Sequence, residues 1–455
     1  MDAPRLAVRD IALFERRVEF RTPFRFGAVT VEGASQAFVR VEVELEDGRR
    51  AMGGTAELMV PKWFDKRPHL SVEDTVDELR AALDSARELY LAAGRDTAFG
   101  LSAACYSAHM ARCADAGLPA LAAAFGPAEM DKAILDALLR ALGLNVFEGF
   151  SANVMGLDAR LAPDISDAAV SAFLSSRRPA GRVALRHTVG MMDPLDGPEG
   201  IAALGEREKV GFFKLKLSGT LDADRQRLAA IAARLPADSR VTLDANEQYA
   251  DAAALTALAD LIARDPDLAP IRDRLLYLEQ PLPREKTFDE PLAAIPFDVI
   301  IDEADDGYGA FAAARALGYA GVSSKSCKGL YKSLVNGARA QANGGFLTAE
   351  DLTCQAGLAV QQDTALVAFL GLTHAERNGH HYADGFSGAP EADAFLAAHP
   401  EFYERSDGDV RLDVKDGAFH IATLAVPGFA SAVLPDWGRL APLKTREPAF
   451  AGEDR

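Results

Sequence analysis

The sequence predicts an α/β fold, a (β/α)8-type TIM barrel preceded by an α+β capping domain, with a C-terminal tail that returns to the cap. Three observations predict it: strands then helices in residues 1–150, eight β-rich runs alternating with helical runs in residues 182–390, and a mixed tail over residues 391–455. With 455 residues, the chain can hold both a barrel of about 250 residues and a second domain.

The capping domain begins with strand-like sequence between residues 5 and 60. The runs RLAVRDIALFERRVEF and QAFVRVEVELEDGRR alternate apolar and polar residues, which predicts an antiparallel meander, and FRTPFRFG and VEGAS are typical of turns. Helical periodicity follows over residues 71–144, where Ser71 opens the first run and a second run follows Pro119.

The central part of the chain repeats a strand and then a helix. We expect eight strands, in the runs VALRHTVG, FFKLKL, RVTLDA, LLYLEQ, FDVIID, GVSSKS, GGFLTAE and LTHAE. Eight such units favour a closed barrel, although an open, doubly wound sheet would show the same alternation. The third gap is long, so we expect an insertion near residues 265–273, and FYERSDGDVRLDVKDGAFHIATL in the tail predicts a hairpin.

Charge and cysteine content exclude several classes of function. The net charge of -18 argues against a nucleic acid or an anionic membrane as partner, because both require a basic face. No run reaches the roughly 18 apolar residues of a membrane span, and no signal peptide opens the sequence. The four cysteines form no CxxC pair, so we expect a cytoplasmic protein without a disulfide framework, as a monomer or a homo-oligomer.

Five successive predicted strands end in a charged residue, in the order Lys216, Asp244, Glu279, Asp302 and Lys325. Each residue alone is typical of a helix cap or a solvated rim. In a parallel barrel, however, the carboxyl ends of the strands converge on one mouth, where catalytic groups lie. The joint pattern therefore predicts an active site with three carboxylates between two amines.

Three adjacent carboxylates repel one another and raise one another's pKa unless a hard cation lies among them. A set of oxygen ligands alone is typical of Mg²⁺, for which Mn²⁺ can substitute. Zinc would prefer histidine or cysteine, and neither occurs at these strand ends. The sequence therefore predicts a magnesium site formed by Asp244, Glu279 and Asp302.

Lys214 and Lys216 are two residues apart on one strand, so both side chains point to the same side. A neighbouring cation and a nearby metal would lower a lysine pKa, which leaves a neutral amine that can act as a base. We predict Lys216, nearer the mouth, as the base and Lys214 as electrostatic support. Glu303 remains an alternative to its neighbour Asp302, and Lys328 remains an alternative to Lys325.

These motifs resemble those of the enolase superfamily, of the mandelate racemase and muconate lactonizing enzyme type. KLKLSG resembles the family's KxK strand, LDANEQY its DxN strand, LEQPLP its EQP strand, IDEADD its DE strand, and SSKSCKG, less closely, its later lysine strand. FRTPFRFGAVT and GGTAE resemble the capping loops that close the site, so residues 24–30 and 58–66 are expected to form a lid.

The resemblance implies magnesium-dependent removal of the α-proton of a small carboxylate substrate, through an enediolate. It assigns the three strand-end acids to the metal, and Lys216 and Lys325 to acid and base roles on opposite faces of the substrate carbon. Asn246, two residues past Asp244, and Glu350, at the end of the seventh strand, are candidate substrate-binding residues.

Several reactions share this intermediate. We favour a racemase or epimerase, which transfers a proton between the two faces, because both lysines are present. The alternatives within the superfamily are a cycloisomerase and a dehydratase or lyase that acts by β-elimination. From another class, a barrel aldolase would use Lys216 or Lys325 to form a Schiff base and would need no metal. A non-enzymatic barrel is disfavoured because the set of five is complete.

Overall fold

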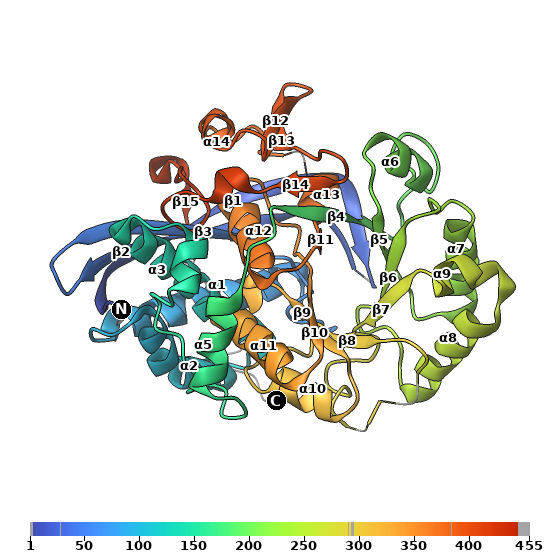
Figure 1. Cartoon of the computed structure of the whole chain (residues 1–455), viewed down its shortest axis with the longest axis horizontal. Coiled ribbons are helices and arrows are strands. Elements are labelled where there is room, and N and C mark those ends of the chain that lie inside the picture. Colours follow the sequence, from blue (N-terminus) through green and yellow to red (C-terminus); the bar gives the residue numbers. More distant parts are fainter. Residues whose placement is uncertain (1–2, 28, 290, 293–294, 384, 445–455) are drawn as a thin grey trace.

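A computed structural model describes residues 3–27, 29–289, 291–292, 295–383 and 385–444 of the chain (Figure 1). Residue 28 of the predicted lid and residues 445–455 of the predicted tail lie outside this described part. Within the described ranges, no helix combines the length and the apolar character needed to cross a membrane.

The N-terminal part is an antiparallel sheet covered by helices. Its strands are β1 Leu6–Phe26, β2 Val29–Leu45 and β3 Arg50–Leu58. Its helices are α1 Val72–Ala92, α2 Ala98–Asp115 and α3 Ala120–Leu142, followed by the shorter α4 Val146–Ser151 and α5 Asp167–Ser176. The predicted meander and the start of α1 are confirmed, since Ser71 and Asp74 cap this helix reciprocally.

The predicted turn in VEGAS is wrong, because the segment lies within β2, and FRTPFRFG belongs to β1 as far as Phe26, so that only Gly27 lies in a turn. β1 continues to Phe26 and pairs with β2 as far as Val29, with a shift of register between Glu19 and Phe24. Phe24 and Phe26 are buried, which explains why this polar and proline-containing segment stays extended instead of turning.

Eight parallel strands form the nearly closed barrel. They are β4 Arg182–Val189, β5 Phe212–Lys216, β6 Arg240–Asp244, β7 Leu275–Glu279, β8 Val299–Ile301, β9 Gly321–Ser324, β10 Phe346–Ala349 and β11 His374–Glu376. Neighbours in sequence pair in parallel from β4 to β10, and β11 pairs with β4, whereas no ladder among the described residues joins β10 to β11. All eight predicted strands are present, and the closure of β11 onto β4 confirms a barrel over an open sheet.

Helices follow the strands and surround the barrel (Figure 1). They include α6 Ile201–Arg207, α7 Leu221–Ala232, α8 Ala252–Arg264, α10 Ala310–Ala316, α11 Leu330–Asn343, α12 Leu358–Leu370 and α13 Asn378–Tyr382. The predicted insertion contains a 3-10 turn, η1 Pro266–Leu268, and the short helix α9 Ala269–Arg272.

The tail contacts both the barrel and the cap sheet. It contains α14 Ala392–Ala398, the predicted hairpin as β12 Tyr403–Ser406 and β13 Asp409–Leu412, then β14 Ala418–His420 and β15 Ala441–Pro442. β14 pairs antiparallel with barrel strand β4, and β15 pairs antiparallel with cap strand β1. The predicted return of the tail to the cap is therefore confirmed.

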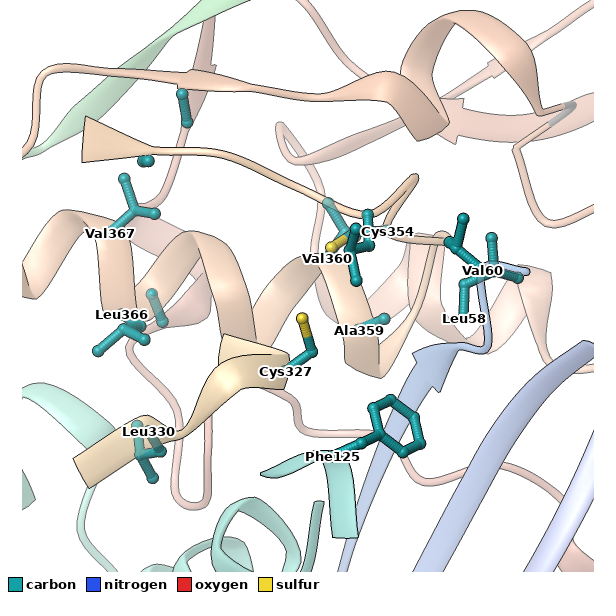
Figure 2. Packing of buried hydrophobic residues seen from close by; sticks show 14 of the residues in the cluster. Leu58, Val60, Phe125, Cys327, Leu330, Cys354, Ala359, Val360, Leu366 and Val367 are labelled. Atoms are coloured by element: carbon teal, nitrogen blue, oxygen red, sulfur yellow. The ribbon is translucent and has the colours of Figure 1, made fainter. Parts of the chain in front are cut away.

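One large apolar core runs through cap and barrel. Figure 2 shows the junction, where Leu58 and Val60 from the end of β3 and Phe125 from α3 lie near Cys327, after β9, and Val360 of α12. This packing places the segment after β3 above the barrel mouth.

Candidate active site

The carboxyl ends of β5 to β9 place the five predicted strand-end residues side by side. Parallel pairing sets Lys216 beside Asp244, and Asp244 beside Glu279. Asp302 directly follows β8, and Lys325 directly follows β9, which pairs with β8. All five side chains are buried, so the structure brings the predicted set together at one mouth.

Lys214 and Lys216 point to the same side of β5, as predicted. Lys216 Nζ lies 2.5 Å from Asp244 Oδ2 and donates to Asn246 Oδ1 at 3.0 Å. Lys214 Nζ lies 2.9 Å from both Asp244 Oδ2 and Glu279 Oε2, and it donates to Glu350 Oε2 at 2.7 Å. Lys214 is therefore held below the mouth by acids from several strands.

Lys325 forms an ion pair with Asp302. Lys328 Nζ also contacts this carboxylate, at 3.1 Å, but it donates in addition to the carbonyl of Ser323 at 2.7 Å. Lys325 and Asp302 line the site cavity, whereas Lys328 and Glu303 are not part of its wall. This geometry favours Asp302 over Glu303 and Lys325 over Lys328 as the functional residues.

A small cavity lies at the mouth, with about 320 Å³ of space between the atoms that is partly open to solvent. Its wall consists of Phe24, Phe26, Val60, Trp63, Lys214, Lys216, Asp244, Asn246, Asp302, Lys325, Asp351, Leu352, Thr353, Glu376 and Asn378. The two amines at its edges each lie near a cap aromatic: Lys216 Nζ is 5.8 Å from the ring centroid of Phe24, and Lys325 Nζ is 4.6 Å from that of Trp63.

The lid segment after β3 is fixed to the barrel by two basic side chains. Arg284, after β7, donates to the carbonyl oxygens of Phe64 at 2.8 Å and Trp63 at 3.0 Å. Lys66 of the lid lies 3.0 Å from Glu303 Oε1. These bonds hold Trp63 over the cavity, while Phe64 turns away and packs in the cap core.

The electrostatics of the acids differ strongly. Burial, together with the carboxylates of Asp244 and Glu350, raises the pKa of Glu279 well above its usual range. Burial also opposes ionisation of Asp302, but Lys325 and Lys328 lower its pKa well below the usual range. Of the three strand-end acids, Glu279 is therefore the one whose negative charge is least compensated.

Lys214 and Lys325 do not have the lowered pKa that a nearby cation would give. Burial favours the neutral amine of Lys214, but the carboxylates of Asp244 and Glu279 outweigh it and raise the pKa well above the usual range. Asp302 and Glu279 likewise raise the pKa of Lys325, against the effect of burial. The reason is that the acids here face the amines directly, whereas the prediction assumed that a cation lies between them.

The donor set fits a hard divalent cation. Both carboxylate oxygens of Glu279 are buried and accept no hydrogen bond among the described residues, because Lys214 at 2.9 Å lies outside hydrogen-bonding geometry. Within the same residues, no three His, Cys, Asp or Glu side chains are arranged as ligands of one ion, since amines lie against Asp244 and Asp302. The three acids therefore lie at the carboxyl ends of neighbouring strands, and the Glu279 oxygens, which accept no hydrogen bond among the described residues, are suitable ligands for an ion.

The candidate substrate contacts have different positions. Asn246 lines the cavity, as predicted for a substrate-binding residue. Glu350 does not line it, because Arg186 and the Tyr277 hydroxyl, at 3.0 Å, hold its carboxylate beside Lys214. Although burial opposes it, Arg186 and Lys214 lower the pKa of Glu350 to about 2.

Sequence reasoning missed five wall residues: Asp351, Leu352, Thr353, Glu376 and Asn378. Glu376 ends β11 and accepts a hydrogen bond from Lys214 at 2.9 Å. The rule that selected the other five, a charged residue at the end of a strand, would also have selected Glu376. Asp351 follows β10 and carried no such signal, because Glu350 occupies the strand end.

Comparisons with known proteins were made for the whole chain. A model of the family described as "Enolase C-terminal domain-like", of the mandelate racemase and muconate lactonizing enzyme type, matches residues 200–433. A search of curated proteins found no match.

Solved structures share the fold at low sequence identity. A dipeptide epimerase from Enterococcus faecalis, complexed with Mg and L-Leu-L-Tyr, is 15% identical with a TM-score of 0.57, over 93% of this chain and 99% of the epimerase. A muconate lactonizing enzyme from Pseudomonas fluorescens, complexed with muconolactone, is 17% identical with a TM-score of 0.61, over 95% and 98%. An enolase superfamily member from Roseovarius nubinhibens, complexed with magnesium, is 19% identical with a TM-score of 0.59, over 96% and 99%.

The family model covers more than half of the 455 residues, and the solved structures match both the cap and the barrel. The chain therefore belongs to the enolase superfamily, with a barrel domain of the mandelate racemase and muconate lactonizing enzyme type.

Proposed function

We propose that this enzyme removes the α-proton of a small carboxylate substrate in the presence of Mg²⁺ and returns a proton to the opposite face, as a racemase or epimerase. One observation carries the proposal. Lys216 and Lys325 both line the cavity, and the three strands between them in the barrel carry Asp244, Glu279 and Asp302. Two amines on either side of an acidic centre can reach a substrate carbon from both faces.

Asp244, Glu279 and Asp302 would hold the metal. When bound, Mg²⁺ would stabilise the negative charge that develops on the substrate carboxylate as the α-proton leaves. The free oxygens of buried Glu279 support this assignment, as do the magnesium-containing structures from Enterococcus faecalis and Roseovarius nubinhibens. Mn²⁺ is the expected substitute, because it accepts the same oxygen ligands.

The protein side chains have separate roles in this mechanism. Lys216, in its neutral form, accepts the α-proton, and Lys325 donates one to the other face of the same carbon. Lys214 is held in its charged form by the surrounding acids, so it adds positive charge where negative charge develops. Phe24 and Trp63 cover the two amines and exclude water from the reacting carbon.

The substrate is proposed to be a small carboxylate that fits beneath the lid. The ligands of two solved relatives, a dipeptide and muconolactone, support this class.

Solvent deuterium exchange tests the proposal. A library of carboxylates is incubated with the enzyme and Mg²⁺ in heavy water, and incorporation at the α-carbon is followed by NMR. We expect exchange with inversion for at least one compound. The variants K216A and K325A should each lose about 10²–10⁴-fold in rate, because that is the usual contribution of a general acid or base. Each variant should mainly affect one enantiomer of the substrate.

A matched control is K286A. Lys286 is an exposed lysine of the barrel domain that donates to the carbonyl of Ala250, so its removal should leave exchange unchanged. A ring-closed product or a lost β-substituent would instead identify a cycloisomerase or a lyase. A borohydride-trapped lysine adduct in the presence of EDTA would identify a Schiff-base aldolase. Absence of exchange from every carboxylate would refute the proposal.

A further inference from the structure

Asp351 differs from the other acids of the cavity wall, because it forms no ion pair among the described residues. Asp244, Asp302 and Glu376 each lie in an ion pair with a lysine. For Asp351, which lines the same cavity and is 4% exposed, no ion pair exists among the described residues. A buried carboxylate without a cation is costly, so such a residue is unusual unless a ligand supplies the charge.

Backbone groups fix the position of this carboxylate but do not neutralise it. Asp351 Oδ1 accepts a hydrogen bond from the backbone N–H of Thr353 at 2.9 Å. The backbone N–H of Asn378 donates to both carboxylate oxygens, to Oδ2 at 2.9 Å and to Oδ1 at 3.1 Å. A carboxylate has about four acceptor positions, so Oδ2 retains one for a further donor. Burial and the nearby Glu376 raise the pKa of Asp351 to about 8, against the opposing charge of Arg377, which is paired with Asp363.

Asn378 provides a second and independent observation. Its side chain lines the same cavity and is 3% exposed. Its Oδ1 is buried and accepts no hydrogen bond among the described residues. A buried acceptor without a hydrogen bond is energetically unfavourable. A bound molecule could supply the donor that this oxygen lacks.

We infer that Asp351 and Asn378 form a subsite for a protonated amine of the substrate, which is accordingly an amino-bearing carboxylate. An ammonium group has the donors that both oxygens lack and the positive charge that Asp351 lacks. A hydroxyl group or a water molecule would satisfy Asn378 but would leave the aspartate uncompensated. The substrate carboxylate then lies toward Lys216 and Lys325, and its amine lies toward the ends of β10 and β11.

This inference rests on the proposed function, and matched pairs of ligands test the two separately. Each pair consists of an L,L-dipeptide and its des-amino analogue, in which hydrogen replaces the terminal ammonium. Binding to the magnesium-loaded enzyme is measured by titration calorimetry, and α-deuteration is measured by NMR. We expect the dipeptide of at least one pair to bind at least about tenfold more tightly, as is usual for hydrogen bonds to charged groups.

The D351N variant keeps the size of the side chain and one acceptor oxygen, which can still accept the N–H groups of Thr353 and Asn378, but it removes the charge and the second acceptor oxygen. It should bind both members of that pair with nearly equal affinity. Its affinity for the dipeptide should fall, and its affinity for the des-amino analogue should stay unchanged. D131N is the matched control, because Asp131 is also a buried acid without an ion pair among the described residues but lies in cap helix α3, outside the cavity wall. This control should retain the preference for the dipeptide.

The outcomes separate the two ideas. If the wild-type enzyme binds the dipeptide more tightly than its des-amino analogue and D351N abolishes this difference, the subsite is supported. If, in addition, no compound undergoes exchange, only the proposed function fails. Exchange or binding that is equally good without the amine overturns the subsite and leaves the proposed function intact. Absence of any amine-dependent binding across the panel also overturns the subsite.

Discussion

Glu279 is the residue whose surroundings depend most on a bound cation. Its carboxylate is fully buried and does not line the cavity, and its pKa is raised by burial and by neighbouring acids. Lys214 is the nearest amine, but this lysine is shared with Asp244, Glu350 and Glu376. Removal of the Glu279 charge would therefore leave Lys214 compensated by the remaining acids.

We predict that E279Q has opposite effects with and without metal. In EDTA, the variant should be more stable to unfolding by about 1–3 kcal/mol, because a buried group without hydrogen bonds is no longer charged. In Mg²⁺, the wild-type protein should gain stability from ligand binding, whereas E279Q should gain little. Thermal unfolding in both buffers measures the effect, and E285Q, at an exposed position near β7, is the control. A less stable E279Q in EDTA would show that Lys214 already compensates this carboxylate.

Most of the site residues that the sequence predicted lie at or next to the end of a barrel strand. Lys216, Asp244 and Glu279 end barrel strands, so topology alone brings them together. Glu350 directly follows strand β10, but Arg186 binds it beneath the cavity, and no sequence pattern predicts such a contact between strands. The pKa values of the lysines could not be predicted either, since they depend on which charge faces each amine.

A buried acid joins the three long helices of the cap, α1, α2 and α3. Asp131 of α3 accepts hydrogen bonds from the hydroxyls of Tyr90 in α1 and Ser102 in α2, each at 2.8 Å. Burial raises the pKa of Asp131 to about 8. The neutral acid is thus favoured in the folded state, whereas an aspartate in the unfolded chain has a pKa of about 3.9.

This difference predicts how the stability of the cap depends on pH. The contribution of Asp131 is fully present below pH ~4, and it is lost as the pH rises toward about 8, because only the unfolded chain releases the proton freely. The D131N variant lacks this dependence. Its free energy of unfolding relative to wild type should therefore increase by a few kcal/mol between pH 5 and pH 8, since each pKa unit corresponds to about 1.4 kcal/mol.

Denaturant unfolding at several pH values measures this difference. D115N, which changes an exposed aspartate at the end of α2, should show no such dependence. A constant difference between D131N and wild type across this pH range would contradict the prediction.

Element positions were predictable where periodicity is strong. The helix that starts after Ser71 and the eight barrel strands follow from local patterns. The extension of β1 to Phe26 does not, because proline and charged residues in FRTPFRFG are typical of a turn. The segment is a strand because the barrel mouth buries Phe24 and Phe26, a tertiary contact that local sequence does not reveal.

In the whole molecule, the cap and the tail complete the site that the barrel begins. The lid places Trp63 near Lys325 through bonds from Arg284, and β15 of the tail pairs with β1, which carries Phe24. The barrel could be predicted from its eight repeats, but the docking of the lid could not, since it depends on isolated side chains far apart in sequence. The division into domains at residues 1–150 and 182–390 stays a prediction.

The most direct measurement is a crystal structure of the protein with Mn²⁺, recorded with anomalous diffraction at the manganese edge. We predict a single anomalous peak bounded by carboxylate oxygens of Asp244, Glu279 and Asp302 at about 2.1 Å, with Lys216 and Lys325 on either side of the cavity. A peak found only elsewhere, or the three acids still paired with lysine amines in the presence of saturating Mn²⁺, would contradict the assignment of this site.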